Sequence, residues 1–327
     1  MTEPRPRRPG LPLLSAGLVV LWSSGFIGAE IGTSRDLAGA SATALLAWRF
    51  LLVAALLGAL VLVLRRRMAR RDVFWHGVIG LLTQAGYLWG VGAAAEQGVA
   101  AGTSALIAAL QPIVGASLAS LLLGERVART QALGLGVGVV GVALVVGGDL
   151  RSADGASAWA HLLPFAAMLA LVAGTLLERR ARPCADLLPA LAVQTGVSAV
   201  LFTVVAGATG TFTPPTEPLF WGAVVWLALL SNLGAYALYW MVLARSDVAR
   251  VSGLLYLTPP TTMLWAWAMF GTAPTATGLA GLVVCAGAVA LIGSGLRPRR
   301  RCGPEGGGSP RPAPAPARAP EHRGPRR

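Results

Sequence analysis

Long apolar blocks are the feature that most constrains what this sequence can fold into. Apolar residues occur in runs of about 20, the length that a helix needs to cross a hydrocarbon core roughly 30 Å thick. Only 13% of the 327 residues are charged and the mean hydropathy is +0.65, which excludes an ordinary water-soluble domain. We therefore predict an all-α polytopic membrane protein.

Ten such blocks occur, and each is expected to be a helix, because a helix satisfies every backbone donor and acceptor within its own segment. Residues 1–32 are interpreted as a retained first helix rather than a cleaved signal peptide, since the apolar part is too long and lacks a small-x-small cleavage site. The expected spans are 13–32, 41–64, 73–93, 99–123, 130–148, 158–177, 187–208, 219–243, 251–270 and 276–296.

The positive charges lie almost entirely on one side of this pattern. All 27 basic residues are Arg, and the connections on one side of the spans carry only Arg35 and Arg151. The opposite side carries Arg5, Arg7, Arg8, Arg65, Arg66, Arg67, Arg70, Arg71, Arg126, Arg129, Arg179, Arg180, Arg182, Arg245, Arg250 and the Arg residues of the C-terminal segment. By the positive-inside rule, both termini of this multi-pass protein are predicted to lie in the cytoplasm, with the spans in the cell membrane. A nucleic-acid partner is excluded, because these Arg residues lie in short connections and not along one face of a domain.

An internal repeat is indicated by the spacing of Pro and Gly. Laying residues 99–148 over residues 246–295 places Pro112 on Pro259. Two units of five spans follow, and since five is odd, the second unit is expected to enter the membrane inverted, as in secondary transporters that bind substrate near the midplane. The Pro-, Gly- and Arg-rich end cannot bury a core and is expected to be disordered. The predicted domains are a first five-helix repeat, 1–150, a second, 151–297, and a disordered cytoplasmic tail, 298–327.

Motifs in three spans resemble, in this order, those of the EamA family of the drug/metabolite transporter superfamily. They are Trp22-Ser23-Ser24-Gly25-Phe26, then Trp48-Arg49-Phe50, then Pro112 followed by Leu122-Leu123-Gly124-Glu125-Arg126. The resemblance covers the chain up to about residue 296. It implies ten transmembrane helices in two inverted five-helix repeats, and the export of amino acids and other small metabolites. The second half departs from the pattern, since Gly271-Thr272 replaces the Gly-Glu pair and the seventh span has no Arg-Phe.

Two ionisable residues lie inside the predicted spans, where a charge is costly enough to be a functional candidate. Arg49 lies roughly 12 Å inside the extracytoplasmic end of the second span, and Glu30 lies near the same face. One hypothesis assigns Arg49 to an anionic substrate group and Glu30 to proton coupling. The alternative, which is favoured for Arg49, is that the two residues pair with each other or that Arg49 extends toward Asp36.

Prolines occur at the centres of two spans, Pro112 in the fourth and Pro259-Pro260 in the ninth. Each ring leaves the carbonyl four residues earlier without its helical donor, and a water-filled cavity can supply the missing partner. A simple packing kink is the alternative for one proline alone. Helix breaks at corresponding points of two repeats instead predict a binding site.

Polar side chains gather at the same depth in five spans. An amide that faced lipid would cost several kcal/mol, so Gln84, Gln111 and Asn232 are expected to point inward. Hydrogen bonding between helices is the alternative to lining a cavity, and it is favoured for Ser and Thr. The candidate substrate-binding residues are Trp22, Ser23, Gln84, Tyr87, Gln111, Asn232, Tyr236, Tyr256 and Thr258.

Metal and cofactor chemistry is not indicated. Cys184, Cys285 and Cys302 lack the spacing of metal ligands, and His76 and His161 are expected at the membrane interfaces. The motifs of metalloproteases, serine hydrolases and phosphate-binding loops are absent, which argues against an enzyme and against an ATP-driven pump.

The remaining class is a secondary transporter. We predict an exporter of small metabolites such as amino acids, which works by alternating access around a midplane cavity and is driven by exchange for protons or by the membrane potential. The alternative is a membrane-embedded enzyme or scaffold without transport activity. The sequence does not indicate an oligomeric state.

Overall fold

The computed structural model describes residues 10–112, 114–115, 117–118, 129–149, 156–246, 251, 254–271 and 273–295. Within these residues every regular element is a helix. The predicted tail, 298–327, lies outside the described residues. The elements are α1 (Leu11–Thr33), α2 (Ala42–Val63), α3 (Arg70–Gly80), the π-helix η1 (Leu81–Gly86), α4 (Tyr87–Glu96), α5 (Ala101–Ala108), α7 (Arg129–Asp149), the 3-10 helix η2 (Ala158–His161), α8 (Leu162–Ala181), α9 (Leu187–Ala208), α10 (Pro218–Trp226), the π-helix η3 (Leu227–Gly234), α11 (Ala235–Arg245), α13 (Thr258–Phe270) and α14 (Ala276–Gly295).

Six helical segments are long and apolar enough to cross a membrane, and they coincide with six of the expected spans. These are Leu11–Thr33, Ala42–Val63, Arg70–Glu96, Ala158–Ala181, Leu187–Ala208 and Pro218–Arg245. Two shorter apolar stretches, Gly136–Gly148 and Ala276–Gly287, lie where two further spans are expected. The helical class is confirmed, whereas the full count of ten spans stays a prediction.

Local sequence signals explain where several helices begin and end. The Ser41 hydroxyl accepts a hydrogen bond from the Ala44 backbone N–H at 3.1 Å and so caps the start of α2. Pro218 begins α10, where a missing N–H costs nothing. Gly271 ends α13 with a φ of 72°, a left-handed conformation that glycine adopts without strain.

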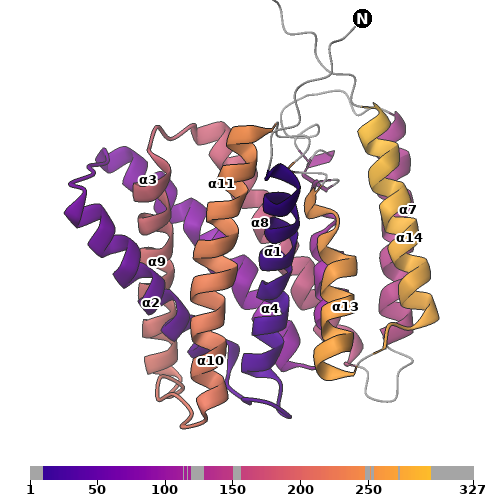
Figure 1. Ribbon diagram of the computed structural model, residues 1–327, viewed down its shortest axis with the longest axis horizontal. Helices are drawn as coiled ribbons and strands as arrows, with labels where there is room; N and C mark the ends of the chain where they lie inside the picture. Colours follow the sequence, from indigo (N-terminus) through magenta and orange to yellow (C-terminus); the bar gives the residue numbers. More distant parts are fainter. Residues whose placement is uncertain are drawn as a thin grey trace, which may run out of the picture. The chain divides into compact units, whose positions relative to one another are not determined.

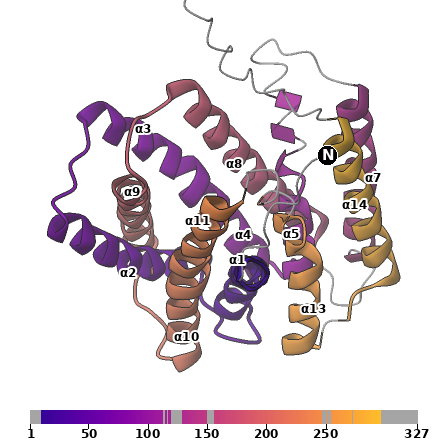
Figure 2. The same cartoon turned by 45° about the horizontal axis from the view of Figure 1, so that its top comes forward.

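Helix α1 lies in the middle of the bundle, as Figure 2 shows, and it contacts α2, α4, α5, α10, α11 and α13. Its Phe26 and Ile27 are buried in the largest apolar cluster, together with Phe220 and Leu227 from the second half of the chain. Helices α2 and α9 pack together, as do α4 and α8 (Figure 1). Both halves of the chain therefore surround α1.

Two of the expected spans are not continuous helices. In the span expected at 99–123, a turn at Ala109–Leu110 follows α5. In the span expected at 251–270, a turn at Tyr256–Leu257 precedes α13. Each turn lies directly before a proline segment, because a proline cannot donate the hydrogen bond that would continue the preceding helix. The prolines expected to break these two spans, Pro112 and Pro259-Pro260, thus lie shortly after an irregular turn in each span.

The two breaks have the same hydrogen bonds, displaced by 147 residues, which is the offset of the sequence repeat. The Leu110 N–H donates to the Ile107 carbonyl at 3.1 Å, and the Leu257 N–H donates to the Leu254 carbonyl at 3.0 Å. Beyond the break, the Val114 N–H donates to Leu110 at 3.0 Å, and its counterpart Thr261 donates to Leu257 at 3.1 Å. The repeat in the sequence thus corresponds to a repeat in backbone structure.

Helices α7 and α14 lie side by side at one edge of the bundle (Figures 1 and 2). Their close approach depends on glycine: a Cβ atom on Gly281 would lie 2.5 Å from the Gly141 carbonyl oxygen. Small residues of this kind let helix backbones approach in a membrane, where dispersion contacts and not water exclusion hold helices together.

We expect Gly281→Ala to lower the thermal unfolding temperature of the detergent-purified protein. The new methyl group meets backbone atoms that cannot rotate away, so α7 and α14 must separate, at a cost of about 1–3 kcal/mol. Gly287→Ala in the same helix is the matched control, because nothing lies within 4 Å of its added Cβ. Equal unfolding temperatures for the two variants would contradict the close contact.

Candidate functional site

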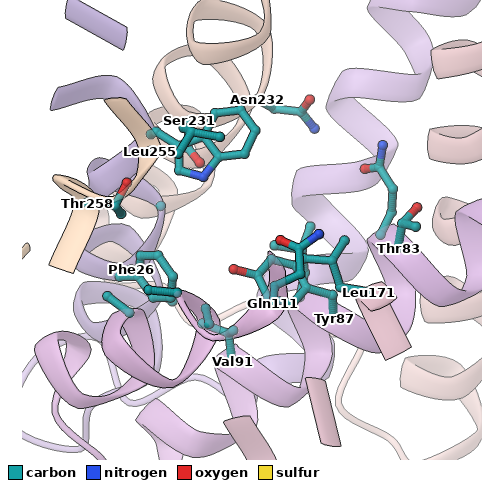
Figure 3. A pocket seen from close by; sticks show the side chains of 18 of the residues that line it. Phe26, Thr83, Tyr87, Val91, Gln111, Leu171, Ser231, Asn232, Leu255 and Thr258 are labelled. Carbon is teal, nitrogen blue, oxygen red and sulfur yellow. The ribbon is translucent and has the colours of Figure 1, made fainter. Parts of the chain in front are cut away.

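A cavity of about 500 Å³ lies among the helices, a volume within the roughly 300–1,000 Å³ typical of small-molecule sites. Its wall is formed by α1, α2, η1, α4, α5, α8, η3 and α11 together with the residues at the two helix breaks. Figure 3 shows side chains from both halves of the chain, among them Tyr87, Gln111, Asn232 and Thr258, around one open space.

The two ends of the cavity differ in exposure. At one end the wall consists of the almost fully buried side chains of Leu45, Ala105 and Leu227. At the other end it includes Tyr239 and the exposed Arg179 in the last turn of α8. The cavity therefore runs from a closed apolar end toward the end of the bundle where α8 finishes.

Two π-helices, η1 and η3, each present an amide to the cavity. Gln84 lies in η1 and Asn232 in η3, and both side chains are 3% exposed. A π-helix holds its turns with i→i+5 hydrogen bonds, and such wide turns are often found at functional sites. Each π-helix sits in the middle of an otherwise α-helical span, between α3 and α4 and between α10 and α11.

The two wide turns share a sequence pattern that the analysis of the sequence missed. Thr83-Gln84-Ala85-Gly86-Tyr87 and Ser231-Asn232-Leu233-Gly234-Ala235-Tyr236 both read hydroxyl, amide, apolar residue and glycine, followed by tyrosine. The second copy has one additional residue before its tyrosine. This pattern was the available signal for the π-helices, and it extends the repeat to a second pair of helices.

Most of the candidate substrate-binding residues line the cavity. Those on its wall are Trp22, Gln84, Tyr87, Gln111, Asn232, Tyr236, Tyr256 and Thr258, together with Arg49 and Pro112. Ser23 does not line it, since its fully buried hydroxyl donates to the Thr258 carbonyl at 3.3 Å. Pro259, Pro260 and Glu30 also do not line the cavity.

Three polar atoms on the cavity wall are buried without a hydrogen-bond partner in the described part of the chain. They are Nε of Arg49, Nδ2 of Asn232 and Oγ1 of Thr258. Buried polar groups in proteins are normally satisfied, so an unsatisfied group calls for an explanation such as a water molecule or a ligand. The three atoms come from α2, η3 and α13 and supply donors from both halves of the chain.

Neither ion pair expected for Arg49 is found among the described residues. The one ion pair among the described residues joins Arg66 to Asp186 at 3.0 Å, and Arg49 takes part in none. The Glu30 carboxylate instead accepts the backbone N–H of Ala101 at 3.1 Å and so caps the start of α5.

A second carboxylate at the same end of the bundle has an equivalent role. Glu96, the last residue of α4, accepts the backbone N–H of Ala42 at 2.9 Å and caps the start of α2. Two carboxylates thus connect four helices of the first half through their ends. The helix that ends at Glu96 is longer than the expected span, so Glu30 is not the only acidic residue in a membrane-spanning helix.

Helix α8 contributes a wall that the sequence analysis did not anticipate. Leu171, Thr175 and Arg179 line the cavity. Their spacing of four residues places them on one face of the helix. That spacing was a usable signal, but an apolar helix with a single Thr offers many equally plausible faces.

A buried chain of hydrogen bonds leads from the cavity into α3. The Gln84 amide donates to Oε1 of Gln194 at 3.4 Å, and Nε2 of Gln194 lies 3.2 Å from Nδ1 of His76. His76 is 4% exposed and His161 is 2% exposed, so both imidazoles are buried within the protein. These hydrogen bonds orient the Gln84 side chain at the cavity wall.

Both halves of the chain are similar to known proteins. Residues 11–147 and 158–294 each match the EamA-like transporter family. A probable terminal-alkyne amino-acid exporter from Streptantibioticus cattleyicolor is 29% identical over 300 residues, which cover 86% of this chain and 93% of the relative.

A solved crystal structure has the same fold. It superposes with a TM-score of 0.56 at 22% identity, covering 87% of this chain and 96% of the other. The two family matches span almost all of the described residues and fall on the two halves that share the helix breaks. This membrane protein belongs to the EamA-like transporter family, which points to a small-molecule transporter and not to an enzyme.

Proposed function

We propose that the protein is a secondary transporter that exports small metabolites such as amino acids by alternating access around the cavity. One observation carries this proposal: broken helices from both halves of the chain meet at a single cavity with unsatisfied polar atoms. Irregular backbone at membrane depth is tolerated where it lines such a cavity. The exporter name of the relative from Streptantibioticus cattleyicolor supports the direction of transport.

The proposed architecture is ten spans in two inverted five-helix repeats, 1–150 and 151–297, followed by the cytoplasmic tail. The matching hydrogen bonds at the two helix breaks and the family matches to two halves support the duplication. Inverted repeats that rock against each other give alternating access in secondary transporters. Exchange for protons or the membrane potential is the proposed energy source.

The cavity is proposed to face the cytoplasm in this structure. Arg66 of the connection after α2 pairs with Asp186 of the connection after α8, so two Arg-rich connections lie at one end of the bundle. Arg179 lines the cavity at the end of α8. Under the positive-inside rule this end is cytoplasmic, and an exporter open to it is ready to take up its substrate.

The orientation can be tested by labelling single cysteines in intact cells with a membrane-impermeant reagent. In a background without Cys184, Cys285 and Cys302, we expect Thr213→Cys to be labelled directly and Arg67→Cys only after permeabilisation. Both positions are exposed, so accessibility alone does not distinguish them. The reverse pattern would overturn the proposed topology.

Removal of one amide from the cavity is expected to weaken transport without preventing membrane insertion. In reconstituted vesicles, Gln111→Leu and Asn232→Leu should each raise the substrate concentration for half-maximal flux by up to about tenfold, since a neutral hydrogen bond contributes roughly 0.5–1.5 kcal/mol. Gln97→Leu is the matched control, because this amide follows α4 outside the cavity. Unchanged flux in both cavity variants would rule out this pocket as the transport site.

A further inference from the structure

Arg49 lacks a counter-charge in the described part of the chain. Its side chain is 4% exposed, and its Nε atom has no hydrogen-bond partner. The guanidinium carbon lies 5.5 Å from the centre of the Phe50 ring. The phenols of Tyr87 and Tyr236 line the same cavity, but they carry no charge when protonated.

No described carboxylate forms an ion pair with Arg49, and four of them have other partners. Glu30 and Glu96 accept the N–H groups of Ala101 and Ala42. Asp186 pairs with Arg66, and Asp72 accepts the N–H of Cys184 at 3.2 Å. Removing a charge from water is unfavourable unless a counter-charge replaces the lost hydration, so the isolated charge of Arg49 requires a partner from outside the described chain.

The position of Arg49 indicates what that partner is. Arg49 lines the cavity, and among the described lining residues the charged ones are Arg49 and Arg179, with no Asp or Glu. A cavity with only positive side chains attracts anions and repels cations. A planar guanidinium forms two parallel hydrogen bonds with a carboxylate, which gives both affinity and a defined orientation.

The cavity wall next to Arg49 suits the short apolar side chain of a small amino acid. Leu45 lies one helical turn before Arg49 on the same face of α2, and it borders the closed apolar end with Phe26, Ala29 and Val91. A ligand whose carboxylate meets Arg49 can therefore place a short apolar side chain at this end.

We propose that Arg49 binds the carboxylate of the transported molecule, so that the substrates are carboxylate-bearing small molecules and not cationic drugs. This inference rests on the proposed transport function. It narrows the substrate class by charge and assigns the charge recognition to one residue in the first half of the chain.

The test compares acids with their amides, which lack only the negative charge. The probes are L-propargylglycine and L-leucine with their carboxamides, and binding is measured on the full-length protein in nanodiscs by calorimetry. We expect wild-type protein to bind the acids more tightly. In Arg49→Gln the affinity for the acids should fall about 10- to 100-fold, as for loss of a charged hydrogen bond, while the affinity for the amides stays the same or rises.

Two further measurements separate binding from a structural role. Without ligand, Arg49→Gln should unfold at the same temperature as wild type or a higher one, because it removes an unpaired buried charge; a marked loss of stability would indicate a structural partner and overturn the proposal. Arg49→Lys should retain part of the preference for acids. Arg35→Gln, an exposed Arg outside the cavity, is the control and should bind like wild type.

The results distinguish a wrong carboxylate site from a wrong transport function. If wild type binds none of the acids, or if Arg49→Gln affects acids and amides equally, the carboxylate site is wrong. If the reconstituted protein transports the amides or other solutes in that case, the proposed transport function still stands. Absence of saturable flux for acids, amides and cationic drugs alike would count against the transport function itself.

Discussion

In the hydrocarbon interior of a bilayer, every backbone N–H and C=O group needs its hydrogen-bond partner within the protein. Most of the described chain meets this condition with uninterrupted helix. Away from the ends of the spans, the described chain departs from regular α-helix at the turns Ala109–Leu110 and Tyr256–Leu257 and at the two π-helices, and all of these border the same cavity. The location of the site therefore follows from where helical hydrogen bonding is interrupted.

The duplication explains the geometry of the cavity but not its charge. Both halves contribute a proline break and a wide turn with an amide and a tyrosine, so the polar wall is built in matching pairs. Arg49 has no such counterpart, because the seventh span contains no Arg. A ligand thus meets a nearly paired set of hydrogen-bonding groups together with the buried charge of Arg49, which comes from the first half alone.

The helices and the inward-facing polar residues could be predicted, because they follow from the apolar blocks and from the positions of proline, glycine and amide residues. Apolar blocks locate helices because lipid demands them, and the amides of Gln84, Gln111 and Asn232 were expected inward because exposure to lipid is costly. The state of Arg49 could not be predicted, since Glu30 was equally able to pair with it or to cap α5. The distance of 3.1 Å between the Glu30 carboxylate and the Ala101 N–H shows that it caps α5. His76 likewise lies within hydrogen-bond distance of Gln194, a residue more than 100 positions away in the chain.

The wide turns also set the rotational register of the helices that follow them. An α-helix advances about 100° per residue, so a turn with one surplus residue rotates every later side chain by about that angle. Tyr87 directly follows η1, and Tyr236 follows η3 by two residues. Both rings face the cavity because of the residue added upstream. If either segment were regular α-helix, its tyrosine would point in another direction while the hydrophobic length of the span would scarcely change.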